Sequence, residues 1–510
     1  MPEQLIEKIK GKLPRTWKSC FAAAMIFGLI AHIYKLTSWL PNWDSLVFRY
    51  DSQNMVAMGR WFLPVASAPS SFYDLPWVAG LLAILFHALA AVCICKMFDV
   101  KKKMTALLIG AAVVSFPTVT SVMMYNYVAD SYSLSFLFAC LAALLMTNKN
   151  IKLSIPAAVL IALSVGIYQA YITVTVMLLL AYLIIEATKK AEIKCLLLQG
   201  VKFMVTGAVG MALYYLVLTV VLKITGTQLL DYQGFSDAAA LSGLNIPASL
   251  YTIKEALIGY FFDFSNGVSL FTIINIAIFA LAILFYVADI VRNKLNILNI
   301  LALVVLVLLL PFCACLLGFV NSSIDYHNLM RMGFFVFYLL YILQYESTDT
   351  SCCRLNIIKA WAVLILTGVM VFNNIIVANI SYHKLNMAYE KSYGVLIRLA
   401  DRIEQTDDAE KCDSILVLGA LEGSEAYTSY LPPDMTGTTD GFILRADDEI
   451  VGQSVLCSAL NDYCGKNYKF LAGDEKNALL DKIDTDSLGN WPSADSVFVI
   501  DNVIVIKLGD

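Results

Sequence analysis

Long apolar stretches separated by short polar loops dominate the first 380 residues. A helix of about 17–25 apolar residues is long enough to cross the hydrocarbon core of a bilayer. The fifth and sixth stretches meet at a tight Tyr168-Gln169-Ala170 corner and would form one bent segment if that corner lay inside the membrane. The pattern predicts a polytopic α-helical membrane protein with about eleven transmembrane helices, at 17–36, 76–97, 104–124, 129–147, 153–168, 170–187, 201–222, 268–290, 297–320, 332–346 and 357–379.

The pattern changes after residue 380. Residues 387–405 predict a helix that continues from the last span, and 414–421 and 441–445 read as strands. Residues 497–508 predict a hairpin that turns at Asp501-Asn502. We therefore expect two domains, a membrane domain over 1–380 and an α/β domain over 381–510.

Composition supports the membrane assignment and separates the two domains by charge. Hydrophobic residues make up 59% and charged residues 15% of the 510 residues, whereas soluble proteins have about 45–50% and 25%. Residues 1–380 carry 25 Lys and Arg against 17 Asp and Glu (25 − 17 = +8), and 381–510 carry 11 against 23 (11 − 23 = −12). Nothing in this distribution indicates a nucleic-acid partner.

The distribution of cations predicts the orientation. With the N-terminus in the cytoplasm and eleven spans, 19 of the 25 cations fall on the cytoplasmic side. Every inner loop is basic only if the Tyr168 corner is a true external turn. The C-terminal domain is then outside the cell, and the long loops 37–75, 223–267 and 321–331 are external. We expect any chemistry on this outer face, and we see none of the internal repeats typical of transporters.

The first outer loop carries the first candidate residues. It holds two carboxylates, Asp44 and Asp51, and then Arg60-Trp61. Residues 54–60 are compatible with a short amphipathic helix lying in the membrane interface, with Met55 and Met58 against lipid. The alternative is that the aspartates are solvated loop charges and Arg60 is a snorkelling anchor, which extends its charged group to the membrane interface.

Two further positions on the outer side carry polar side chains. Asp130 stands near the start of the fourth span, where an unpaired carboxylate is costly. Its alternative interpretation is a helix-start carboxylate, stabilised by the helix dipole by about 0.3–1 kcal/mol. Tyr168 and Gln169 offer hydrogen-bonding groups at the external corner, and Gln169 is the more informative of the two because interfacial tyrosines are common.

The last outer loop places Asp325, His327 and Arg331 just before the tenth span. If this segment is helical, His327 and Arg331 are four residues apart and share one face. An arginine here suits a lipid-linked phosphate, which its guanidinium can bind with two parallel hydrogen bonds. The alternative is an interfacial anchor with a surface histidine. His87 lies within a span and is expected to be a packing residue.

The sequence contains no zinc-spaced cluster, phosphate-binding loop or serine nucleophile motif. The order of its segments does resemble a known family. A carboxylate-bearing first outer loop ending in GRWFL is followed by YNYVADSYSLSFLFACLAALL, then SVGIYQAY, then a charged loop with an arginine before a late span. This order resembles the GtrII-like membrane glucosyltransferases, which are polytopic enzymes of the GT-C class.

The resemblance implies a GT-C-like fold and an inverting-type hexosyltransferase, with glucose as the expected sugar. The donor would be a polyprenyl-phosphate hexose, and the acceptor a surface glycan such as an O-antigen, wall polysaccharide or teichoic acid. The enzyme would act at the outer face of a bacterial cytoplasmic membrane. The resemblance assigns the catalytic base to Asp44 or Asp51, with Asp44 favoured. A divalent metal is used by some relatives and is left open here, with no metal ligand assigned.

The remaining candidates are expected to bind substrate. The departing lipid phosphate needs cationic or hydrogen-bonding stabilisation, for which Arg331, Arg60 and His327 are candidates. Asp130, Tyr168 and Gln169 complete the set. A lipid or polysaccharide flippase is the main alternative, although its charges should line a path through the middle of the membrane. A membrane acyltransferase, with His87 as its only candidate catalytic histidine, and a non-catalytic scaffold are the others.

Overall fold

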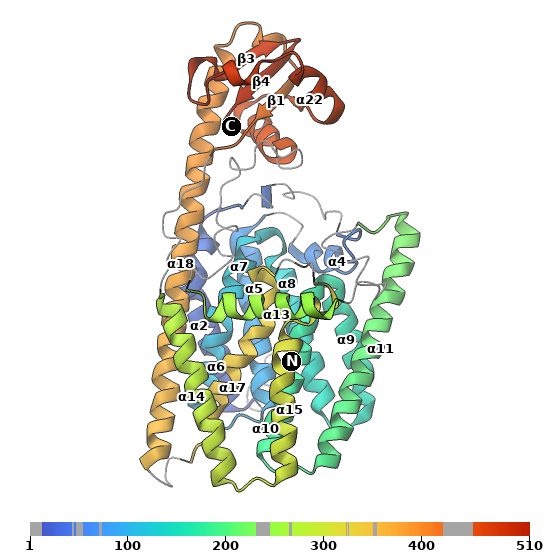
Figure 1. Ribbon diagram of the computed structural model, residues 1–510, viewed down its shortest axis with the longest axis vertical. Coiled ribbons are helices and arrows are strands. Elements are labelled where there is room, and N and C mark those ends of the chain that lie inside the picture. Colours follow the sequence, from blue (N-terminus) through green and yellow to red (C-terminus); the bar gives the residue numbers. More distant parts are fainter. Residues whose placement is uncertain are drawn as a thin grey trace, which may run out of the picture. The chain divides into compact units, whose positions relative to one another are not determined.

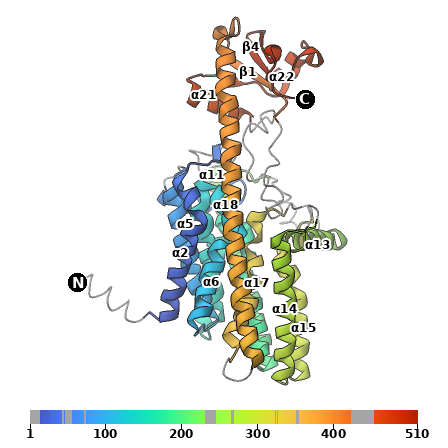
Figure 2. The same cartoon turned by 90° about the vertical axis from the view of Figure 1, so that its left-hand side faces the viewer.

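The computed structural model describes residues 13–42, 45–46, 55–70, 74–230, 245–264, 268–322, 324, 326–349, 354–421 and 452–509. The described residues separate into two compact units. The first comprises residues 13–38 and 55–379, and the second comprises 39–42, 45–46, 380–421 and 452–509. The helix α18 (Arg354–Glu404) is continuous in Figures 1 and 2 and contributes residues to both units. The prediction that the segment after 387 continues the last span as one helix is confirmed.

All the secondary-structure elements in the described residues of the first unit are helices (Figure 1). Its α-helices besides α18 are α2 (Arg15–Thr37), α4 (Leu63–Ser67), α5 (Pro76–Met97), α6 (Lys103–Ser115), α7 (Pro117–Met124), α8 (Ala129–Thr147), α9 (Ser154–Ile167), α10 (Ile172–Thr188), α11 (Ile193–Thr225), α13 (Ile246–Phe261), α14 (Leu270–Arg292), α15 (Ile297–Ala314), α16 (Leu316–Val320) and α17 (Phe335–Ser347). Short 3₁₀ turns join several of them: η1 (Ala68–Ser70), η2 (Asn126–Val128), η3 (Ile151–Leu153), η4 (Gln169–Tyr171) and η5 (Asn328–Phe334).

The chain is a membrane protein by the length and composition of these helices. Within the described residues, 8 helices are long and apolar enough to cross a bilayer, or 9 if the bent pair α6–α7 is one span, and the segment Ile151–Ile167 is apolar but shorter. Nine of the eleven stretches expected to span each lie largely within one helix, whereas 104–124 is divided between α6 and α7 and 297–320 between α15 and α16. The count of eleven spans itself stays a prediction.

The helices divide into a buried set and a set with exposed apolar faces. All of α7 and most of α6 and α8 are buried. In α11 and in α15, only 22% of the residues in an apolar stretch of 18 are buried. Small residues permit the closest helix contacts: a Cβ atom added at Gly110 in α6 would lie 2.3 Å from the carbonyl oxygen of Cys20 in α2. The exposed apolar faces are suited to lipid.

The helices α6 and α7 form one bent unit. Proline cannot donate a backbone hydrogen bond and disfavours a helical conformation at the preceding residue. Phe116 is accordingly extended (ψ 137°), Pro117 starts α7, and the two helices meet at 40°. The turns η2, η4 and η5 all lie at the end of the bundle where α8, α10 and α17 begin, and η5 contacts α7 and η4. We call this the η end.

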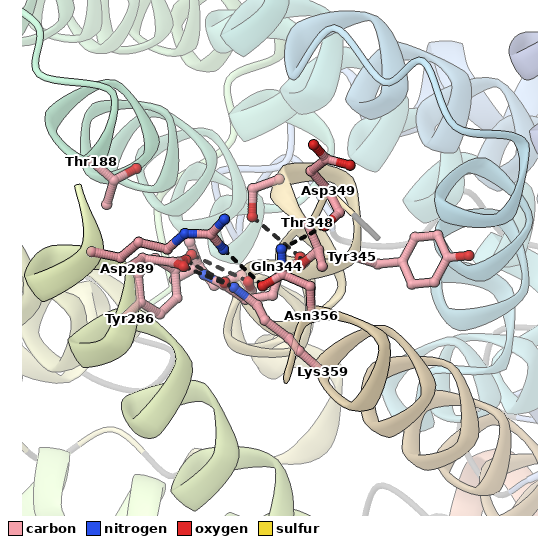
Figure 3. A network of polar contacts seen from close by, with 12 residues as sticks. Thr188, Tyr286, Asp289, Gln344, Tyr345, Thr348, Asp349, Asn356 and Lys359 are labelled. Carbon is pink, nitrogen blue, oxygen red and sulfur yellow. Dashed lines mark hydrogen bonds and ion pairs between the residues drawn. The ribbon is translucent and has the colours of Figure 1, made fainter. Parts of the chain in front are cut away.

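The opposite end is held by a polar network, part of which is shown in Figure 3. The ammonium group of Lys359 in α18 forms an ion pair of 2.9 Å with Asp289 in α14. The side chain of Asn356 accepts a hydrogen bond from Arg292 and donates one to the carbonyl oxygen of Asp349. These contacts join the last turn of α14 to the start of α18.

The helix α13 crosses the direction of α14 (Figure 1). The sequence analysis placed this segment in an external loop. On its buried side, Ser249 and Thr252 donate hydrogen bonds to backbone carbonyls of α16 and of the residues after it. Its other side exposes Ile246 and Tyr251. This distribution is typical of a helix that lies along a membrane surface.

The second unit contains a mixed sheet in the order β2-β1-β4-β3. The strands are β1 (Ser414–Leu418), β2 (Lys469–Phe470), β3 (Val497–Ile500) and β4 (Val503–Lys507). Strand β1 is parallel to β2 and β4, and β3 pairs antiparallel with β4. Asp501 and Asn502 both have positive φ, as a two-residue hairpin turn requires, so the predicted hairpin is confirmed.

Both faces of this sheet are covered. One face packs on α18 and on α21 (Ser458–Cys464), and the other packs on α22 (Gly473–Leu480). Alternate residues of β1 therefore point to different cores: Ile415 and Val417 to the first, Leu416 to the second. The strand predicted at 441–445 lies outside the described residues.

Candidate active site

Arg60 is held against two tyrosines at the η end. Its Nη1 donates a hydrogen bond of 2.9 Å to the hydroxyl oxygen of Tyr132 in α8. Its guanidinium carbon lies 4.9 Å from the centre of the Tyr168 ring. The rings of Tyr132 and Tyr168 are themselves stacked, with centroids 4.6 Å apart and planes 11° apart. A guanidinium over an aromatic face is attracted by the ring's negative π face, which fixes its position.

The segment that carries Arg60 is tied to the corner between α9 and α10. The side-chain amide of Gln169 donates a 2.7 Å hydrogen bond to the carbonyl oxygen of Met58. The hydroxyl group of Tyr214 in α11 donates to the carbonyl oxygen of Gly59, and the backbone N–H of Phe62 donates to that of Gly166. The structure therefore brings together three of the predicted residues, Arg60, Tyr168 and Gln169.

The interfacial helix predicted over 54–60 is wrong. Residues 55–59 form turns, and the side chain of Met55 is 2% exposed. The reason is long-range packing. A Cβ atom added at Gly166 in α9 would be 2.7 Å from the indole ring of Trp61. The segment that carries Trp61 is therefore packed tightly against α9. Its hydrogen bonds go to neighbouring elements instead of along a helix.

Asp130 is buried in the first turn of α8, with 2% of its surface exposed. Its Oδ1 accepts a 2.8 Å hydrogen bond from the backbone N–H of Ser131. The Ser131 hydroxyl group is also 2.9 Å from that of Ser67 in α4. The side chains of residues two apart in an α-helix point about 200° apart around the helix axis. Asp130 therefore points away from Tyr132, the tyrosine that binds Arg60.

Arg331 is a second guanidinium at the η end. It is 4% exposed, and its Nη2 donates a 2.6 Å hydrogen bond to the carbonyl oxygen of Tyr326. Its guanidinium carbon lies 5.2 Å from the centre of the Tyr260 ring in α13. Burial raises the pKa of the Tyr260 phenol well above its usual range, although the charge of Arg331 opposes this shift. The ring therefore stays neutral beside the cation.

His327 and Arg331 do not share a helical face. His327 precedes η5 with an extended backbone (ψ 169°), and residues 328–334 form a 3₁₀ helix. In this geometry residues three apart align, whereas residues four apart do not. Asn328 instead points toward α7, where its amide donates to the hydroxyl oxygen of Ser121. His327 is half-buried at the entrance to the turn.

The proposed catalytic carboxylates, Asp44 and Asp51, lie outside the described residues, and so does Asp325. Among the residues that are described, no group of three His, Cys, Asp or Glu side chains is placed to hold a metal ion. His87 behaves as the expected packing residue, since its ring stacks on Phe136 and its Nδ1 lies 2.9 Å from the carbonyl oxygen of Ala83.

The sequence analysis missed one aromatic partner of each arginine. Tyr132 stands two residues after Asp130, and Tyr260 lies in the segment taken as a loop. The only signal in the sequence was the concentration of tyrosines around Asp130 and Tyr168. Together these residues supply two cations with fixed positions and a buried carboxylate, a set that suits an anionic substrate.

Comparison with known proteins identifies a family. The sequence profile of the family described as glucosyl transferase GtrII matches residues 33–344. The match covers more than half of the chain and includes both arginines, Asp130 and the turns of the η end. Neither the curated proteins nor the solved structures gave a significant match. The chain belongs to the GtrII glucosyltransferase family.

Proposed function

We propose that this glycosyltransferase moves a hexose, glucose by its family's description, from a polyprenyl-phosphate donor to a cell-surface glycan. The observation that carries the proposal is the buried guanidinium of Arg331 at the η end, held by a backbone carbonyl and an aromatic ring. A guanidinium in a fixed position can hold a phosphate with two parallel hydrogen bonds. We expect it to hold the phosphate of a lipid donor that enters from the membrane.

The transfer is a single displacement at the anomeric carbon. The bond between this carbon and the phosphate oxygen breaks, and its electron pair leaves with the polyprenyl phosphate. A bond forms to the acceptor hydroxyl oxygen, whose proton passes to a carboxylate, so the anomeric configuration is inverted. We assign this general base to Asp44, with Asp51 as the second candidate. Arg331 and Arg60 stabilise the charge that develops on the leaving phosphate.

The remaining candidates position the substrates. Gln169 and Tyr168 hold the Arg60 segment. Asp130, which is anchored at the start of α8, and His327 at the entrance to η5 provide hydrogen-bonding groups for the sugar. Acid–base catalysis and electrostatic stabilisation by these side chains need no resident cofactor, and a role for a divalent metal stays open.

The proposed location is the outer face of a bacterial cytoplasmic membrane, with the N-terminus inside and the second unit outside. Two exposed lysines, Lys101 and Lys469, make suitable labelling positions. An impermeant thiol reagent on intact cells should modify a cysteine introduced at Lys469 and leave one at Lys101 unmodified. The reverse result would contradict this orientation.

The donor class is tested with purified protein in lipid nanodiscs and a glycan extract. Glucose should be transferred from polyprenyl-phosphate glucose and not from a nucleotide-linked glucose. Transfer from the nucleotide sugar would contradict the proposal. A protein that moved the intact lipid-linked sugar across proteoliposomes, without breaking its glycosidic bond, would instead be a flippase.

A further inference from the structure

A large apolar cavity lies between α10, α11 and α15 (Figure 1 labels the three helices). Its volume is about 730 Å³, within the roughly 300–1,000 Å³ of pockets that bind small molecules. The walls include Leu179 and Leu183 from α10, Val201 from α11 and Leu309 from α15. Every residue that lines it is apolar or glycine. The cavity is therefore suited to a hydrocarbon, not to a sugar or an ion.

The cavity is long enough to hold an extended hydrocarbon chain. Its lining on α11 runs from Ile193 to Met211. At 1.5 Å per residue, these positions span about 27 Å along the helix axis. The hydrocarbon core of a bilayer is about 30 Å thick. An occupant that fills the cavity lengthwise is therefore a long hydrocarbon chain.

Two glycines keep the α11 wall open. Gly200 and Gly207 are seven residues apart, so they lie on one face of α11, and a Cβ atom added at either would meet nothing within 4 Å. Glycine inside a helix costs roughly 1 kcal/mol relative to alanine. Since the space at both positions admits larger side chains, the glycines are not there to permit close helix packing.

One end of the cavity reaches the η end. Ile172, which directly follows η4, and Leu316 both line the cavity. Leu316 begins α16, and the turn η5, which carries Arg331, contacts α15 just before it. The turn η5 packs on α10, since a Cβ atom at Gly333 would lie 2.9 Å from the Thr173 hydroxyl oxygen. A hydrocarbon chain in the cavity would thus present its head group near Arg331.

We propose that this cavity binds the isoprenoid tail of the lipid-phosphate donor, with the phosphate at Arg331. The assignment rests on the proposed function, because it takes the donor class from there. Charge complementarity selects an anionic head group, and the length of the apolar lining selects a long single tail. The methyl branches of an isoprenoid need more width than a straight chain, which the two glycines provide.

The test fills the cavity without disturbing the fold. Gly200→Leu and Gly207→Leu place a side chain in open space and improve helix propensity. Gly368→Leu in α18 is the matched control, because a Cβ atom there also meets nothing within 4 Å and Gly368 does not line the cavity. Binding of three probes is measured in nanodiscs: a long-chain polyprenyl phosphate, prenyl phosphate with a single isoprene unit, and hexadecyl phosphate.

Each cavity variant should weaken binding of the long polyprenyl phosphate about tenfold, equivalent to about two methylene groups left unburied. Prenyl phosphate, which is too short to reach the glycines, should bind all variants equally, and Gly368→Leu should match the unmodified protein. If the cavity variants weaken the binding of hexadecyl phosphate as much as that of polyprenyl phosphate, the isoprenoid assignment is wrong. If they leave the binding of polyprenyl phosphate unchanged, the cavity assignment is wrong. If binding depends on Gly207 but no hexose is transferred, the proposed function fails and the cavity assignment stands.

Discussion

The guanidinium of Arg60 donates a 2.9 Å hydrogen bond to the hydroxyl oxygen of Tyr132, 72 positions later in the chain. This contact joins the segment before α4 to the first turns of α8. The Tyr168 ring stacks on Tyr132 and also lies beneath the guanidinium. Arg60 is thus oriented by two elements that the sequence separates widely, which preorganises a cation for an anionic substrate.

Replacing Tyr132 with phenylalanine keeps the stacked ring and removes the acceptor for Arg60. A hydrogen bond to a charged group contributes about 1.5–3 kcal/mol, so the KM for the lipid-linked donor should rise about tenfold or more. Steady-state kinetics on the purified variant measures this. Tyr215→Phe is the control, because Tyr215 on α11 is 40% exposed and should tolerate the change. A Tyr132→Phe enzyme with unchanged kinetics would remove Arg60 from donor binding.

Arg331→Lys should weaken donor binding while the protein stays folded. Lysine keeps the positive charge but cannot hold a phosphate with two parallel hydrogen bonds, nor stack as a plane on Tyr260. We expect about tenfold weaker binding of polyprenyl phosphate, from the loss of one charge-assisted hydrogen bond. Arg15→Lys, at an exposed position, is the control. Unchanged affinity in Arg331→Lys and Arg331→Ala would move the phosphate site, most directly to Arg60.

Glu346→Gln should lower stability without changing the catalytic site. The Glu346 carboxylate accepts hydrogen bonds from the backbone N–H groups of Lys101 and Lys102 and a 2.6 Å bond from the Thr105 hydroxyl group. It therefore caps the N-terminus of α6, where negative charge is favourable. The variant should lose about 1–2 kcal/mol of stability. A lower midpoint of thermal unfolding, with normal kcat at low temperature, is the expected result.

Glu192→Gln serves as the control for that change, since Glu192 is exposed beside α11. If Glu346→Gln loses a larger fraction of its activity than of its folded protein, the two ends of the bundle are coupled.

Periodicity and length predicted the helices well because each depends on local sequence. The stretch at 104–124 shows the limit. Its composition predicts one span, but Pro117 divides it into α6 and α7. The hairpin at Asp501-Asn502 was predictable because its turn is specified by two adjacent residues. The helix α13 was not, since its apolar residues are too few for a span and only tertiary packing defines its buried side.

The residues of the candidate site could be predicted from the sequence, but the contacts between them could not. Costly charges near the boundary predicted to be the outer one identified Arg60, Asp130 and Arg331. Their partners lie far away in sequence, as Tyr260 does from Arg331, so no local pattern could pair them. The 3₁₀ form of η5 was also hidden, because the residues 328–334 fit an α-helix equally well.

Asp44→Asn should reduce hexose transfer about 10²–10⁴-fold, the usual contribution of a general base. Asparagine keeps the shape of the side chain but cannot accept the acceptor's proton, so donor binding should change little. Asp51→Asn is the internal comparison. If Asp51→Asn alone is inactive, the base is Asp51, and if both variants transfer normally, the first outer loop is not the source of the base and Asp130 becomes the next candidate.

The most direct test of hexose transfer follows both products of one reaction. Purified protein in nanodiscs is mixed with polyprenyl-phosphate glucose, labelled in the sugar, and with the glycan acceptor. Equal amounts of free polyprenyl phosphate and labelled glycan should form together, with little donor cleavage when the acceptor is left out. Donor that stays intact in the presence of an acceptor shown to be competent, or donor cleaved to free glucose at the same rate with and without acceptor, would contradict the proposed transfer.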